Sequence, residues 1–170
     1  MKKIEISKLD AAKRQLKTAI NLYFSYGDPV SIHTLASAAR EILYDLNKKH
    51  SDTSMLLDDH LMRDEMKKKY NKILRDPQNF FKHADWNPEG ILNLNPDISP
   101  IFIYDAILKY QELTHETVPY FIIFRGWYWA HHPDHFFLTE EQKDTAKNVI
   151  TRYGDDRLSY FSDSVTTLGL

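Results

Sequence analysis

The chain has 170 residues, of which 42% are hydrophobic and 27% are charged, and its formal net charge is −2. These values predict a single globular domain, 1–170, with its own core, and they exclude a general electrostatic attraction to nucleic acid or acidic membranes. The chain contains no cysteine, which excludes disulfides, thiolate metal sites and a cysteine nucleophile. No signal-peptide pattern or membrane-length apolar run is present, so we expect a cytoplasmic protein without membrane contact.

Two amphipathic helices are predicted at the start of the chain. Apolar residues repeat at intervals of three and four between Ile6 and Phe24, and again between Ile32 and Leu46. In the segment between them, Gly27 is expected to take the left-handed position that ends the first helix, and Asp28 and Pro29 to open the second. This pattern predicts an antiparallel helical hairpin.

Further helices are expected from about Ser54 to Leu74, from Ser99 to Leu113, from Thr139 to Tyr153, and within 155–165. Segment 118–130 is ambiguous, because its aromatic and β-branched residues favour a strand while its spacing favours a buried helix. The helical surroundings favour the helix. We therefore predict an all-α fold, a compact bundle of about six or seven helices that begins with the hairpin.

The segment from Arg75 to Trp86, RDPQNFFKHADW, concentrates polar residues suited to chemistry. Asp76 and Pro77 are typical of a helix start, and Asn79 and His83 are spaced to share one helix face. A histidine beside an amide and a cation suits general acid–base chemistry on a phosphate ester, so Arg75, Asn79 and His83 are the candidate catalytic residues. The alternative is local capping and a half-buried histidine, without catalysis.

Two resemblances follow from these segments. The segments AINLYF, GDPVSIHTLASAAREIL and NFFKHAD resemble those of an uncharacterised family of small bacterial all-α proteins, over about the first ninety residues. The hairpin followed by Arg75, a polar neighbour and His83 more distantly resembles the HEPN superfamily, with a longer spacer between the two residues. Many members of that superfamily are ribonucleases and others are inactive binding modules, so the resemblance implies a metal-independent ribonuclease or a binding domain.

Basic residues precede and overlap this segment. Lys67, Lys68, Lys69, Lys72 and Arg75 end the predicted third helix, and Lys82 and Asp85 flank His83. Lys72, Lys82 and Asp85 are candidates for binding a phosphate or another ligand group, with RNA or a nucleotide as the possible partner. Alternatively, the lysines complement the negative end of a helix dipole.

The histidines at 131, 132 and 135 do not match a metal-site spacing. We interpret them as structural or exposed residues, and we predict no metal and no cofactor. No glycine-rich phosphate loop is present.

Aromatic residues between Tyr120 and Trp129 occupy all sides of the predicted helix. A core explains one side, and the excess is interpreted as a homodimer interface with Phe124, Trp127 and Trp129, or else as a ligand pocket or stacking platform. Arg125 within this block is expected to pair with Asp105 or Glu112.

Three functional hypotheses follow. The favoured one is a non-catalytic interaction or regulatory module that forms a dimer. The others are a HEPN-like ribonuclease that uses His83 with Arg75 and Asn79, and a protein that binds a nucleotide or another small anion.

Overall fold

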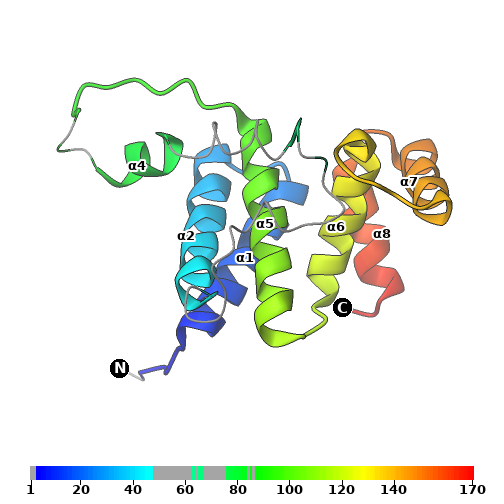
Figure 1. The fold of residues 1–170 in the computed structure, drawn as a ribbon, viewed down its shortest axis with the longest axis horizontal. Helices are drawn as coiled ribbons and strands as arrows, with labels where there is room; N and C mark the ends of the chain where they lie inside the picture. Colours follow the sequence, from blue (N-terminus) through cyan, green and yellow to red (C-terminus); the bar gives the residue numbers. More distant parts are fainter. Residues whose placement is uncertain (1–2, 48–62, 64, 67–75, 84, 86) are drawn as a thin grey trace.

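The computed structural model describes residues 3–47, 63, 65–66, 76–83, 85 and 87–170. Within these ranges the chain forms seven α-helices and two short 3-10 helices and no strand, which confirms the predicted all-α class (Figure 1). The predicted helix from Ser54 to Leu74 falls almost entirely outside the described residues. No helix in the described ranges has the length and apolar character that a membrane span requires.

The first two helices form the predicted antiparallel hairpin. Helix α1 covers Lys8–Phe24 and begins at Ser7, whose hydroxyl accepts a hydrogen bond from the Asp10 amide. Helix α2 covers Pro29–Asn47, and the Asp28 carboxylate accepts from the Ser31 amide at 2.7 Å. The apolar stripes of both helices are buried against each other and against α5, as the three- and four-residue spacing predicted.

Helix α5, Ser99–Thr114, is the centre of the bundle and follows the 3-10 helix η2, Pro96–Ile98. It packs against α1, α2 and α6, and nearly all of its residues up to Tyr110 are buried. Two buried residues of α5, Asp105 and Lys109, belong to the acidic and basic residue types. Asp105 accepts from the Arg40 guanidinium of α2 at 2.6 Å, and Lys109 donates to Glu112.

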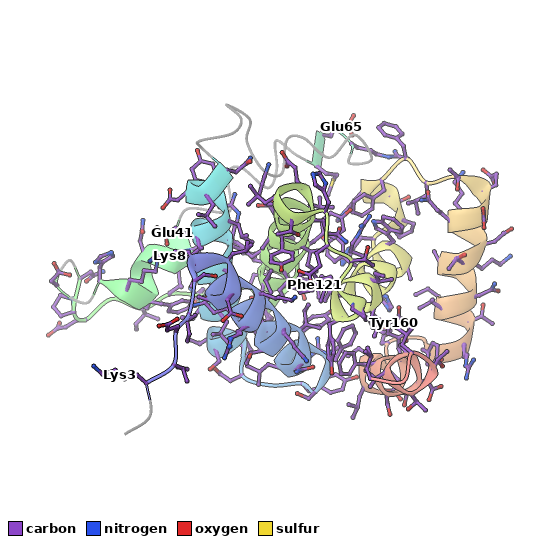
Figure 2. The ribbon with its side chains drawn as sticks, turned by 90° about the horizontal axis from the view of Figure 1, so that it is seen from below. Lys3, Lys8, Glu41, Glu65, Phe121 and Tyr160 are labelled. Carbon is purple, nitrogen blue, oxygen red and sulfur yellow. The ribbon has the colours of Figure 1, made fainter. Side chains whose placement is uncertain are left out.

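Helix α6 covers Pro119–His131, so the ambiguous segment is a helix and not a strand. It is followed by the 3-10 helix η3, Pro133–His135, and by α7, Glu140–Tyr153, which begins with a capping box formed by Thr139 and Gln142. Helix α8, Arg157–Thr167, packs against α6. Figure 2 shows Tyr160 of α8 directed toward α6, where its hydroxyl donates to the Ile123 carbonyl oxygen at 3.0 Å.

Helix α4, Asp76–Lys82, lies at the opposite edge of the molecule from α7 and α8 (Figure 1). It contacts α2, and Lys82 Nζ lies 2.6 Å from Glu41 Oε2. Figure 2 shows Glu41 on the side of the bundle nearest α4.

Two expectations about individual residues were wrong. The left-handed residue at the end of α1 is Tyr26, with φ of 56°, and not Gly27. Arg125 pairs with neither Asp105 nor Glu112: its guanidinium donates to Gln111 Oε1 at 2.8 Å and lies over the ring of Trp129. An amide oxygen and an aromatic face thus replace the expected carboxylate.

Candidate functional site

A cavity of about 220 Å³ lies at the end of the bundle where α5 begins and α6 ends, the upper end in Figure 1. The ends of α1 and α6 and the beginnings of α2, α5 and α8 all contribute to it. Its polar and aromatic lining is Tyr23, Asp97, Ser99, His132 and Arg157. We call this cavity the arginine pocket.

Arg157, the first residue of α8, is held between two tyrosine rings. Its Cζ atom lies 4.3 Å from the ring centroid of Tyr23 and 4.2 Å from that of Tyr26. Tyr23 is in turn fixed by Trp127, whose Nε1 donates to the tyrosine hydroxyl at 3.1 Å. Both ring contacts have the geometry of a cation–π interaction, so they stabilise the charge while leaving the edge of the guanidinium plane available.

The Arg157 guanidinium forms no hydrogen bond or ion pair with another residue in the described part of the chain, and its buried Nε is among the atoms left without a partner. A guanidinium has five N–H donors in a fixed plane and suits bidentate binding of a carboxylate or phosphate. Arg157 is therefore a preorganised cation whose donors form no hydrogen bond within the described part of the fold.

Tyr26 reaches Arg157 because of an unusual helix end. The Gly27 amide donates to the Leu22 carbonyl at 2.7 Å and the Tyr26 amide to that of Tyr23, a Schellman arrangement in which Tyr26 occupies the position normally taken by glycine. A non-glycine residue in this conformation costs about 1–2 kcal/mol. Gly27 has a different role: a Cβ there would be in tight contact with the Leu22 carbonyl oxygen, at 3.1 Å.

His132 supplies a neutral imidazole to the same cavity. Desolvation, with the nearby His135 and His131, lowers its pKa to about 4, and only the charge of Asp97 acts in the opposite direction. His132 therefore carries no charge at neutral pH and offers one donor and one acceptor. Arg157 is the cation of the arginine pocket.

Ser99 connects this cavity to a buried histidine. The Oγ of Ser99 lies 3.3 Å from Nδ1 of His33, which is fully buried between the rings of Phe81 and Phe102. Burial lowers the pKa of His33 to about 4. Such a histidine is a weak base, and Ser99 is itself buried, so this pair does not form an activated nucleophile.

The candidate catalytic residues lie elsewhere, at α4. Asn79 and His83 are exposed and are one helical turn apart, with the His83 amide donating to the Asn79 carbonyl at 3.1 Å, while Arg75 lies outside the described residues. Of the candidate phosphate-binding residues, Lys72 is also outside, Lys82 is paired with Glu41, and Asp85 is exposed. Because Arg75 lies outside the described residues, the structure gives no distance between Arg75 and His83.

The candidate interface residues are mostly part of the core. Phe124 is fully buried and Trp127 is 3% exposed within the single chain, so neither is available to a partner, which corrects that assignment. Trp129 is half-buried and donates from Nε1 to the Tyr104 hydroxyl. The aromatic excess of α6 is absorbed because α5, α8 and the end of α1 cover it on several sides.

The histidines near 131 have structural contacts. His131 stacks on Trp127 and lies within hydrogen-bonding distance of the carbonyls of Trp127 and Gly154. His132 stacks on Tyr128 and His135. Across the described ranges, no three histidine, aspartate or glutamate side chains are grouped as a metal site requires.

Sequence reasoning did not identify the arginine pocket. Its residues come from five separate segments, and none of them stands in a recognisable motif. The one local signal is Asp156, a helix-capping residue that places Arg157 at the first position of α8. A basic residue at a helix N-terminus opposes the helix dipole and is therefore unusual.

Comparison with protein-family models, with curated proteins and with solved structures finds no match to this chain.

Proposed function

We propose that this protein is a non-catalytic binding module whose ligand is a small anion, a carboxylate or a phosphate, held in the arginine pocket. The observation that carries the proposal is Arg157, a guanidinium fixed between Tyr23 and Tyr26 with none of its donors engaged by the described residues. Arginines that only stabilise a fold usually pair with a carboxylate or with backbone carbonyls.

The surroundings of Arg157 favour an anion in three ways. The cavity is partly enclosed, so a charge pair inside it is screened less than one on the surface. The N-terminus of α5, at Ser99, contributes the positive end of a helix dipole. The neutral His132 and the Ser99 hydroxyl supply hydrogen bonds without adding a competing negative charge.

Strain at Tyr26 supports the same conclusion. The left-handed conformation places the tyrosine ring over Arg157 at an energetic cost that a glycine would avoid. Backbone strain of this kind tends to occur at functional sites, where the surrounding structure enforces it.

The test is titration calorimetry of the whole chain with inorganic phosphate and with 4-methylpentanoate, at low ionic strength. We expect the wild type to bind at least one of them, and Arg157→Gln to lose about tenfold or more in affinity. The control is Arg152→Gln, because Arg152 lies on the neighbouring helix and forms an exposed ion pair with Asp163. Absence of binding by the wild type, or equal binding by Arg157→Gln, refutes the proposal.

Loss of the two ring contacts in Arg157→Gln could also lower stability, so Arg157→Lys is measured in parallel. Lysine keeps the charge but cannot form the planar bidentate contact. We expect it to bind more weakly than the wild type and more tightly than the glutamine variant. Thermal melts of all three proteins establish that the comparison is made on folded protein.

The other hypotheses stay predictions. A HEPN-like ribonuclease requires Arg75 near His83. Asn79 and His83 are exposed at α4, so a large substrate such as RNA could reach both side chains. The homodimer requires a surface other than Phe124 and Trp127. A cytoplasmic location is retained as part of this proposal.

A further inference from the structure

The arginine pocket has a second uncommitted charge, on Asp97. Asp97 belongs to η2 and lines the cavity together with Arg157 and His132. The backbone amide of Asp97 donates to Asn95 Oδ1, but its carboxylate forms no ion pair or hydrogen bond with the described residues. Its charge acts on His132, so the carboxylate is close to that ring.

Asp97 differs in this respect from the two other carboxylates next to the cavity. Asp28 caps α2 by accepting from the Ser31 amide, and Asp156 caps α8 by accepting from the amide and hydroxyl of Ser159. These hydrogen bonds lower the pKa of both groups. Asp28 and Asp156 are therefore committed to the fold, whereas no residue that the structure describes occupies the Asp97 carboxylate.

Arg157 and Asp97 line one cavity but form no ion pair with each other. Each is thus a separate point of recognition with opposite sign. The cavity is also lined by Pro29, Pro96 and Pro100 and by Ile32, whose side chains are largely apolar. Charged groups beside an apolar wall are typical of sites for small molecules that combine charged groups with an apolar side chain.

We infer that the ligand is a small zwitterion, such as an apolar α-amino acid, whose carboxylate binds Arg157 and whose ammonium group binds Asp97. This inference rests on the proposed function and adds the ammonium group to it. Asp97 then supplies specificity, because a ligand lacking the ammonium leaves its carboxylate without a partner.

The experiment compares three probes that share one side chain: L-leucine, 4-methylpentanoate, which lacks the amino group, and 3-methylbutylamine, which lacks the carboxylate. Each is titrated into the wild type, Asp97→Asn and Arg157→Gln. Asp97 is exposed and its carboxylate forms no hydrogen bond or ion pair with the described residues, so the Asp97→Asn variant is expected to fold normally. Asp134→Asn, which changes an exposed carboxylate of η3, is the matched control.

We expect wild type to bind leucine about tenfold or more tightly than 4-methylpentanoate. Asp97→Asn should remove that difference while keeping the affinity for 4-methylpentanoate, and Arg157→Gln should weaken both. If phosphate or 4-methylpentanoate binds through Arg157 as tightly as leucine does, the zwitterion inference fails and the proposed function stands. If no probe binds the wild type, both fail.

Discussion

Gly126 of α6 lies against Tyr160 of α8, and substituting it by alanine tests the packing of these two helices directly. A Cβ atom at Gly126 would lie 2.8 Å from the hydroxyl oxygen of Tyr160, closer than van der Waals contact allows. That hydroxyl donates to the Ile123 carbonyl, and the ring is enclosed by Phe24, Trp127 and Tyr153. The ring is buried and cannot simply move aside.

The magnitude follows from two opposing effects. Alanine in a helix interior is favoured over glycine by about 1 kcal/mol. Overpacking against a rigid buried group costs about 1–3 kcal/mol, and displacement of the Tyr160 hydroxyl adds about 1 kcal/mol for the lost hydrogen bond. We therefore expect Gly126→Ala to lower the free energy of unfolding by about 1–3 kcal/mol. Each kcal/mol should lower Tm by about 2–4 °C.

The assay is urea denaturation of four proteins: wild type, Gly126→Ala, Tyr160→Phe and the double variant. Among the described residues, and apart from the local helix backbone and the two chain neighbours, the Tyr160 hydroxyl is the only atom that the new Cβ would meet within 4 Å. In the Tyr160→Phe background, Gly126→Ala should therefore stabilise the protein by up to about 1 kcal/mol. An equal cost of Gly126→Ala in both backgrounds would refute the reasoning, as would stabilisation of the wild type.

Three further predictions concern other parts of the chain. Arg40→Met should lower the free energy of unfolding, measured by urea denaturation, by about 3 kcal/mol, because it removes the guanidinium bonded to the buried Asp105 carboxylate. Arg14→Met, which breaks the exposed ion pair with Asp10, should lower it by less than about 1 kcal/mol. Similar costs for the two variants would contradict the prediction. Since burial lowers the pKa of His33 to about 4, protons bind preferentially to the unfolded chain between about pH 6.5 and 4, so stability should fall across this range by up to about 3 kcal/mol. In melts recorded as a function of pH, His33→Leu should reduce this loss of stability. An unchanged dependence of Tm on pH in the variant would contradict the assignment to His33. If the ribonuclease hypothesis holds, the wild type should cleave RNA in the presence of EDTA and His83→Ala should not. The Tm of the variant should be unchanged because His83 is exposed. No cleavage by the wild type would exclude the ribonuclease hypothesis.

The helices could be predicted because their signals are local. Apolar spacing indicated α1, α2 and α5, and Thr139 with Gln142 indicated the start of α7. In segment 118–130, the helical spacing proved more informative than the strand propensity of its residues, because α6 is buried on several sides and accommodates bulky rings.

The errors arose where the outcome depends on tertiary contacts. Gly27 was the expected left-handed residue by intrinsic preference, but Tyr26 takes that conformation, and Gly27 instead lies where a Cβ atom would be in tight contact with Leu22.

Phe124 and Trp127 gave the pattern of an excess apolar surface. Tyr23 and Phe24 of α1 pack against Phe124. Tyr160 of α8, more than thirty residues later in the chain, packs against Trp127. The arginine pocket could not be predicted because it depends on how five helix ends meet.

The helix end at Tyr26 has a consequence for laboratory evolution. Tyr26→Gly would relieve about 1–2 kcal/mol of backbone strain. Loss of the ring contact with Arg157 and of the exposed hydrogen bond from the Tyr26 hydroxyl to the Asp155 carbonyl oxygen would offset this gain only in part, so a screen that ranks variants by heat resistance should accept the change. The same substitution would delete one of the two faces that orient Arg157. Selection for heat resistance should therefore favour glycine at position 26, whereas selection for ligand binding should retain tyrosine. Stability and ligand binding thus oppose each other at this one residue.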